Sequence, residues 1–236
     1  MARLARVVVP DAPHHVTQRG NRRMQTFFSD DDYQAYLDLL ADWCDARGVR
    51  IWAYCLMPNH VHLILVPPSE DALCRAVGEA HRRYTRRINF RQGWRGHLWQ
   101  GRFASFVMDD AYLIAATRYV ERNPVRAKLV ERAEDWPWSS AAGHVDGRRK
   151  GLAETDWLAE QIAGWTFTWR EYLLEPEEAE LAAAMRRHEH TGRPLGDAGF
   201  VKTVGKLLRR NLLPGKPGRP RKPKETPRRP RPKAKK

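Results

Sequence analysis

An apolar run from residue 51 to residue 66, with Pro58-Asn59 at its centre, constrains this chain more than any other stretch. Its length and its central turn predict a hairpin of two β-strands, near residues 49–57 and 60–66. Side chains two residues apart lie on the same face of a strand. His60 and His62 therefore share a face, where two neutral imidazoles would form half of a divalent-metal site. Stacking of the two rings in a packed core is the alternative interpretation.

Strand and helix patterns flank this hairpin on both sides. Strands are predicted at residues 13–19 and 103–107, and helices at about 30–47, 70–90 and 110–122. Ser29 to Asp32 has the pattern of a capping box for the first helix, Asp109-Asp110 caps the third, and Pro124 ends it. The order β-α-β-β-α-β predicts an α+β fold: a ferredoxin-like, split β-α-β antiparallel sheet with helices on one face.

The charge of the chain is concentrated at its C-terminal end. Residues 214–236 contain eleven of the 42 Lys and Arg residues, one acidic residue and seven of the 16 prolines, so they carry about ten of the net +14 charges. This composition predicts a disordered basic arm whose natural partner is a polyanion. Around Gly218 the arm resembles an AT-hook, in which Arg219 and Arg221 would enter a narrow minor groove. We expect non-specific contact with duplex DNA from this arm.

The cysteine pattern and the hydropathy of the chain indicate its cellular compartment. The three cysteines form no C-x-x-C pair, and no segment approaches 18 uninterrupted apolar residues. The basic and apolar N-terminal stretch is too short for a secretory signal. These features predict a cytoplasmic, nucleoid-associated protein with no membrane contact.

The third predicted helix carries two candidate site residues. Tyr119 and Asn123 are four positions apart and so lie on one helix face. An amide oxygen from Asn123 could complete a two-histidine site for Mg²⁺ or Mn²⁺. A phenol beside such a metal suits nucleophilic attack on phosphorus, which would leave a phosphotyrosine linkage and a free 3′ hydroxyl without ATP. The sequence does not single out the base that activates the phenol.

Four stretches together resemble the REP-associated tyrosine transposases, which belong to the single-tyrosine branch of the HUH nuclease superfamily. The resemblance covers about residues 5–140 and is carried by residues 14–22, 56–63, 98–103 and 119–127, which read HHVTQRGNR, LMPNHVHL, LWQGRF and YVERNPVRA. It implies a metal-dependent endonuclease and strand transferase that cuts and rejoins single-stranded DNA at hairpin-forming repetitive extragenic palindromes. By position, Tyr119 matches the nucleophile, His60 and His62 match the metal ligands, and Asn123 falls where relatives use Gln as a third ligand.

Three parts are predicted: a catalytic domain at 1–145, which the resemblance implies, a helical extension at 146–213 and the basic tail at 214–236. Within the extension, helices are predicted near 176–190 and 197–210. A small DNA-contacting unit and a plain helical hairpin both fit this pair. Relatives that move insertion sequences are dimers with shared sites, whereas REP-associated members act as monomers, so the oligomeric state of this chain is left open.

Several arginines are candidate contacts to DNA phosphates. Arg82, Arg83, Arg86 and Arg87 crowd one side of the second helix next to Tyr84, as in a track where cations follow a single strand and aromatic rings stack on bases. Trp94 is a further stacking candidate, whereas Trp99 is expected to pack. His14 and His15 could reach the metal from the neighbouring strand. The remaining candidates flank the first and fourth strands and are Arg19, Arg22, Arg23 and Arg102.

Other functions fit less well. A histidine-triad hydrolase requires a third histidine at the position of Ile64, which excludes it. An RNase H-like transposase would need three convergent carboxylates, and Asp109, Asp110 and Glu121 are better explained as helix caps and surface residues. The main alternative is a domesticated, non-cleaving protein that binds hairpin DNA as a regulator or architectural factor. Binding alone would not require the two histidines and Tyr119 together.

Overall fold

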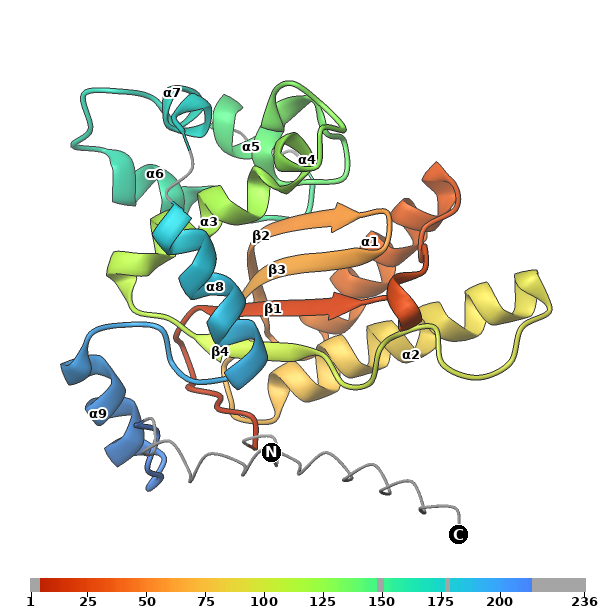
Figure 1. Ribbon diagram of the computed structural model, residues 1–236, viewed down its shortest axis with the longest axis horizontal. Helices are drawn as coiled ribbons and strands as arrows, with labels where there is room; N and C mark the ends of the chain where they lie inside the picture. The colour runs from red at the N-terminus through yellow and green to blue at the C-terminus, as the bar shows by residue number, and fades with distance from the viewer. Residues whose placement is uncertain (1–4, 148–150, 177–178, 214–236) are drawn as a thin grey trace, which may run out of the picture.

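The protein is built around one four-stranded antiparallel sheet (Figure 1). The computed structural model describes residues 5–147, 151–176 and 179–213. β3 lies between β1 and β2, which are joined through a helix, as the split β-α-β pattern predicts. The α+β fold class is therefore confirmed. The strands, in the order β2-β3-β1-β4 across the sheet, are β1 (His14–Arg19), β2 (Arg50–Met57), β3 (His60–Val66) and β4 (Ala104–Val107).

The pairing of β3 with both neighbours determines which side chains share a face. Leu63 lies opposite Val16 on β1 and Tyr54 on β2, and all three are buried in one hydrophobic cluster on the first face. His62 lies opposite Thr17 on β1 and Cys55 on β2, so it points to the second face. Because the side-chain period of a strand is two, this register alone places the His60 and His62 pair away from the first face.

Two helices, α1 (Asp30–Asp45) and α2 (Ala72–Gln92), cover the first face. Ser29 precedes α1, but its side chain makes no capping hydrogen bond. The Asp32 carboxylate accepts from the backbone N–H of Phe28 at 2.9 Å and from the guanidinium of Arg91 at 2.6 Å. The predicted capping hydrogen bond of the Ser29 side chain is therefore wrong. The Asp32 carboxylate instead binds Arg91 and so connects α1 to α2.

The second face is covered by α3 (Asp110–Glu121) and α8 (Ala179–Thr191), so helices lie on both sides of the sheet (Figure 1). The prediction of helices on one face is therefore wrong, because the apolar side chains of the second face pack against α3 and the extension. The Asp109 side chain accepts from the N–H of Tyr112 at 3.0 Å, which confirms the predicted cap of α3. α3 ends before Pro124, which lies in the first turn of the short helix α4 (Asn123–Arg126).

The C-terminal extension packs on the sheet domain. The helices predicted near 176–190 and 197–210 are α8 and α9. Between them, Leu195 pairs with the end of β4: its N–H donates to the Val107 carbonyl at 2.8 Å, and its carbonyl accepts from the Asp109 N–H at 3.1 Å. The boundary at residue 145 stays a prediction, and α5 runs across it. The remaining helices here are α5 (Ala141–Asp146), α6 (Asp156–Ile162), α7 (Trp169–Leu174) and α9 (Ala198–Leu207).

Among the residues placed in the structure, no helix has the length and apolar character that a membrane span requires.

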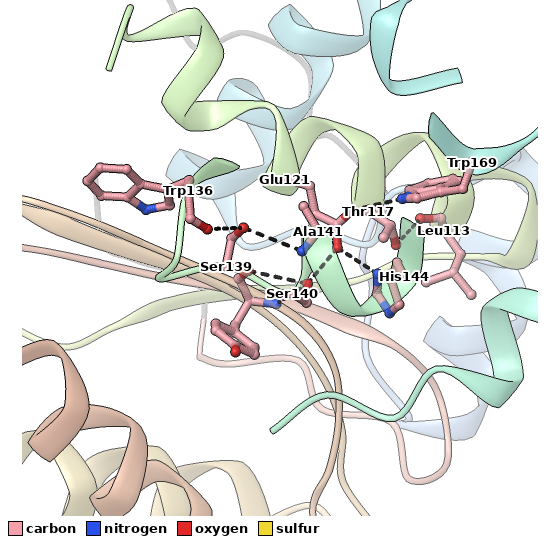
Figure 2. Close-up of polar contacts among 10 residues, drawn as sticks. Leu113, Thr117, Glu121, Trp136, Ser139, Ser140, Ala141, His144 and Trp169 are labelled. Carbon is pink, nitrogen blue, oxygen red and sulfur yellow. Dashed lines mark hydrogen bonds and ion pairs between the residues drawn. The ribbon is translucent and has the colours of Figure 1, made fainter. Parts of the chain in front are cut away.

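Glu121, at the end of α3, joins this helix to the extension (Figure 2). Its side chain is completely buried. One carboxylate oxygen accepts from the Ser140 hydroxyl at 2.5 Å and lies 2.6 Å from Nδ1 of His144, and the other accepts from the indole N–H of Trp169 at 2.9 Å. The expectation that Glu121 is a surface residue is therefore wrong, because α5 and α7 cover it.

The contact between Glu121 and His144 is a buried ion pair. Burial opposes protonation of the His144 ring, but the charge of Glu121 and its hydrogen bond outweigh it, so the pKa of His144 lies above its ordinary value. A histidine whose pKa is raised by folding stabilises the fold fully below its unfolded pKa of about 6.5. That stabilisation is lost as the pH rises through the higher folded value.

We expect Glu121→Gln to lower the free energy of unfolding by about 3 kcal/mol at pH 6, since it removes one partner of a buried pair. The loss should shrink toward pH 9, because the His144 ring gives up its proton as the pH rises through its raised pKa. Urea unfolding of wild type and variant at the two pH values measures this difference. An equal loss at both would show that the contact is not ionic.

Candidate active site on the second face of the sheet

His62 and His15 form the centre of the candidate site. They lie on neighbouring strands, and Nε2 of His15 is 3.0 Å from Nδ1 of His62. Their rings are stacked with centroids 5.2 Å apart, and both side chains are buried. His15 of the adjacent strand therefore lies beside His62, and its approach to a metal ion stays a prediction. His14 points elsewhere: its ring accepts from the Val9 N–H at 3.1 Å and contacts the Ala12 carbonyl.

His60 lies on the same face as His62, at the turn end of β3. The two ring centroids are 5.0 Å apart, and Nδ1 of His60 is 2.6 Å from the side-chain oxygen of Asn59. Arg19 of β1 is directly opposite His60 in the strand register. The shared face and the short separation of the two imidazoles follow the spacing in the sequence.

All three imidazoles are held neutral by burial. Desolvation lowers the pKa of His15 to about 3, and the pKa of His60 falls to about 3 with a further contribution from Arg19 and Arg126. The pKa of His62 is also well below its ordinary value, chiefly through burial. Neutral imidazoles keep a lone pair on one ring nitrogen, which is the form that binds metal ions.

Tyr119 reaches this site from α3. Its ring centroid is 5.9 Å from that of His62 and 6.3 Å from that of His15, and the residue is 4% exposed. Arg126 of α4 lies over the same ring, with its guanidinium carbon 4.3 Å from the ring centroid. The structure therefore brings together the predicted tyrosine and histidines, and adds a cation. Arg126 was missed in the sequence, although its spacing of seven from Tyr119 would place it two turns further along a continuous helix.

Asn123 is buried beside Tyr119, but its amide is engaged within the helices. The Nδ2 group donates to the carbonyls of Tyr119 at 3.0 Å and Val120 at 3.1 Å, and Oδ1 accepts from Arg126 at 2.5 Å. These contacts hold the junction of α3 and α4. A role as third metal ligand stays a prediction, and it would require Oδ1 to leave Arg126.

Glu189 of α8 is a site residue that the sequence analysis missed. Its Oε1 atom lies 3.9 Å from Nδ1 of His15 and 3.9 Å from Nδ1 of His62. Burial raises the pKa of Glu189 to about 7, against the opposing effect of nearby arginines. No local pattern distinguishes this glutamate from its neighbours on α8, so only the packing of α8 on the sheet reveals it.

The arginines of α2 lie on the other side of the sheet. α2 packs on the first face, so Arg82, Arg83, Arg86 and Arg87 are exposed on the side opposite His62. They line an open groove with Phe90, which is 90% exposed. Tyr84 is wrong as a stacking residue, because it is fully buried and its hydroxyl donates to the Thr26 carbonyl at 2.8 Å.

The other DNA-contact candidates are distributed over the surface. Arg22 and Arg23 are exposed in a 3₁₀ turn, and Arg102 lines a pocket beside Glu189. Trp99 is packed in the core as expected, whereas Trp94 is 40% exposed with its ring edge against Phe28. Arg219 and Arg221 lie outside the described residues.

Comparison with known proteins connects this architecture to transposases. The model of the family described as "Transposase IS200 like" matches residues 9–123. A Haemophilus influenzae protein assigned to the REP-associated tyrosine transposases is 31% identical over 108 residues, which cover 41% of this chain and 61% of that protein. The chain thus spans less than two thirds of that relative. A REP-associated tyrosine transposase of Escherichia coli is 26% identical over 141 residues, or 59% of this chain and 80% of the relative.

The fold has a solved counterpart. The structure of a REP-associated tyrosine transposase bound to a REP hairpin superimposes with a TM-score of 0.54 and 24% identity, covering 66% of this chain and 91% of the other. The family match spans the segment from before β1 to Asn123, and so includes His15, His60, His62 and Tyr119. Residues 9–123 of this chain are therefore similar to the IS200-like transposase family, in line with the resemblance to the tyrosine transposases.

Proposed function

We propose that this protein is a single-stranded DNA endonuclease and strand transferase that acts on hairpin-forming repeat DNA through Tyr119. The observation that carries the proposal is the position of the Tyr119 ring, 5.9 Å from His62 and 6.3 Å from His15, with Arg126 over it. A packed tyrosine needs no such neighbours. The match of residues 9–123 to a transposase family model supports the same conclusion.

In the proposed reaction the Tyr119 oxygen attacks the phosphorus of a DNA phosphodiester. A bond from phosphorus to the tyrosine oxygen forms and the bond to the 3′ oxygen breaks, which leaves a 5′-phosphotyrosine and a free 3′ hydroxyl. The phenol loses one proton and the departing oxygen gains one. The phosphodiester energy is kept in the protein–DNA linkage, so reversal by another 3′ hydroxyl rejoins DNA without ATP.

The side chains around Tyr119 suit a phosphate. His60 and His62 present neutral imidazoles on one face, and they would hold a Mg²⁺ or Mn²⁺ ion. Such an ion, when bound, offsets the negative charge that develops on the phosphate. Arg126 lies over the Tyr119 ring, and Arg19 is opposite His60 in the strand register. We assign to them contacts with the phosphate that Tyr119 attacks.

The DNA partner is inferred from charge and from relatives. One structural neighbour was solved with a REP hairpin, and we propose hairpin DNA as the substrate here too. The single-stranded DNA that flanks the hairpin would run along the arginine-lined groove of α2, on the first face of the sheet. Arg82 and Arg83 share Glu79 as an ion-pair partner, so Arg86 and Arg87 are the stronger candidates for phosphate contact. The basic tail would add non-specific duplex contact.

The first test is covalent capture. The full chain is incubated with an end-labelled, single-stranded hairpin from repeats beside its own gene, with Mn²⁺ or Mg²⁺, and separated on a denaturing gel. We expect a band at the combined mass, and at least about a 1,000-fold loss of it in Tyr119→Phe, with hairpin binding retained. Tyr112→Phe, which alters another tyrosine of α3, is the control. Equal cleavage by Tyr119→Phe would exclude Tyr119 as the nucleophile. Tight binding without any adduct would support a non-cleaving regulator.

The metal requirement is tested separately. We expect chelation to abolish the adduct, Mn²⁺ to restore it in wild type, and His62→Ala to stay at least about 100-fold below wild type after Mn²⁺ is added. His97→Ala, at an exposed histidine outside the site, is the matched control. Full adduct formation in chelator would rule out the metal.

The role assigned to the α2 groove leads to a prediction about the affinity for hairpin DNA. Replacing Arg86 and Arg87 with Gln should weaken hairpin binding and reduce the slope of log K against log salt by about one per lost phosphate contact. Arg75→Gln, on the same helix but paired with Asp71 at 2.7 Å, should leave the slope unchanged. Fluorescence anisotropy at several salt concentrations measures both. An unchanged slope in the double variant would place the DNA elsewhere.

A further inference from the structure

A pocket of about 180 Å³ lies where the turn after β1 meets the loop after α2. The turn is the 3₁₀ segment Asn21–Arg23, and the loop runs over residues 93–98. Pockets for drug-sized ligands enclose roughly 300 to 1,000 Å³, so this smaller pocket suits a single planar ring system. Its lining includes Asn21, Met24, Asn89, Trp94 and Arg95, and none of the described residues that line it is acidic.

The turn holds two arginines in a backbone conformation that residues other than glycine rarely adopt. The angle φ is +54° at Arg22 and +62° at Arg23. Hydrogen bonds fix the turn from two sides: the Asn21 N–H donates to the Leu98 carbonyl at 2.8 Å, and Nδ2 of Asn59 donates to the Arg23 carbonyl at 3.0 Å. Left-handed backbone of this kind persists only where its surroundings enforce it, and it gathers at ligand sites. Two exposed guanidinium groups are thus presented from a fixed turn beside the pocket.

Trp94 gives the pocket an aromatic wall on an equally well-fixed loop. Its N–H donates to the Asn89 carbonyl at 2.8 Å, and Nδ2 of Asn89 donates to the Gly96 carbonyl at 2.9 Å, so the loop closes onto the end of α2. The Trp94 ring makes a T-shaped contact with Phe28 and stays 40% exposed, and Met24 is 50% exposed. Exposed apolar side chains that gather in this way mark a binding surface.

The pocket lies at the same end of the sheet as His60 of the candidate active site. Asn59 connects the two, because its side-chain oxygen is 2.6 Å from Nδ1 of His60 while its Nδ2 binds the carbonyl of Arg23. Arg19, which is opposite His60, comes two residues before Asn21, so the Cα atoms of Arg19 and Asn21 are at most about 7 Å apart. A base in the pocket would therefore belong to a nucleotide close to the phosphate at the active site.

On its other side the pocket adjoins the arginine-lined groove of α2. Asn89 lines the pocket, and the next residue, Phe90, lines the groove. The pocket thus lies between the candidate active site on the second face and the groove on the first face. A DNA strand that joins Tyr119 to the groove would pass it.

The chemistry of the pocket suits a nucleobase. An unpaired base has two π faces that stack on an aromatic ring and an edge of hydrogen-bond donors and acceptors. Trp94 supplies the ring, and the amides of Asn21 and Asn89 belong to a residue type that both donates and accepts. The exposed arginines at 22, 23 and 95 supply positive charge for the phosphates on either side of such a base.

We propose that this pocket binds one unpaired base of the single strand that flanks the hairpin, stacked on Trp94, with neighbouring phosphates at Arg22 and Arg23. The inference rests on the proposed function for its DNA substrate and adds a base-binding subsite to it. Because the turn and the loop are both fixed by hydrogen bonds, the subsite is formed before DNA arrives. It would set the position of the strand relative to Tyr119.

A double-mutant cycle between protein and DNA tests this inference. Hairpin oligonucleotides with single-stranded flanks carry an abasic site at one flanking position after another. Fluorescence anisotropy measures their affinity for the full chain in the Tyr119→Phe background, so that the DNA stays uncut. We expect one position at which loss of the base weakens binding at least about fivefold, as stacking on an aromatic ring implies. Trp94→Ala should weaken binding of intact DNA by a similar factor and have no further effect on DNA that is abasic at that position.

Matched variants separate stacking from charge and from general damage. Trp94→Phe keeps an aromatic face and should retain most of the affinity. Phe167→Ala, at a ring of the extension that is 44% exposed, should bind every oligonucleotide as the parent chain does. Replacing Arg22 and Arg23 with Gln should reduce the slope of log K against log salt by about one per lost phosphate contact, on intact and abasic DNA alike. A thermal melt checks folding, and Trp94→Leu replaces Trp94→Ala if the latter is unfolded.

The outcomes distinguish the base pocket from the proposed function. Additive losses from Trp94→Ala and the abasic site at every position, or Trp94→Ala binding intact DNA like the parent chain, would overturn the pocket. The Tyr119 adduct formed by the wild-type chain would still support the proposed function. If the coupling is found but wild type forms no adduct, the nucleophile is wrong and the pocket stands. If the chain binds none of the oligonucleotides, both proposals fail.

Discussion

The candidate site depends on the pairing of β3 between β1 and β2. β3 pairs with β1 on one side and with β2 on the other, so the register places Leu63 toward α1 and α2 and His62 toward α3 and α8. The same pairing brings His15 of β1 within 3.0 Å of His62. A slip of one residue would exchange the two faces and bury the histidines under the wrong helices. The apolar side chains on the first face oppose such a slip, because they fill a closed core with α1 and α2.

Tyr119 depends on a second constraint, the attachment of α3 to the extension. Arg118 and Glu121 flank it in the sequence and are both buried. The Arg118 guanidinium donates to backbone carbonyls of residues 172, 175 and 176, and Glu121 accepts from Ser140 and Trp169. Burying two charged groups is costly unless every polar atom is paired. Here the pairing fixes the rotation of α3, so the face that carries Tyr119 is directed to the sheet.

The extension is consequently part of the site. The family match ends at residue 123, yet helices α7 and α8 of the extension contact the helix that carries Tyr119 or the histidine pair, and Arg126 of α4 lies over the Tyr119 ring. The segment that matches the family model contains the four strands, the histidine pair and the tyrosine. The features contributed by the extension, including Glu189, belong to this chain's own packing. They indicate that a separated sheet domain would lack part of the site.

Local periodicity determined the strands, the main helices, the shared face of His60 and His62, and the helix that carries Tyr119, because each of these follows from contacts between residues near in sequence. Tyr84 was predicted to stack on bases from its place beside the α2 arginines, and Glu121 was predicted to lie at the surface. Both predictions were wrong because the two side chains are buried against neighbouring segments. No pattern in the sequence identifies Glu189 as a site residue, because the two histidines beside it lie on strands that are far from it in the sequence. The tertiary structure alone determined which side chains surround His62. Their burial and their distances from His62 depend on segments that are far apart in the chain.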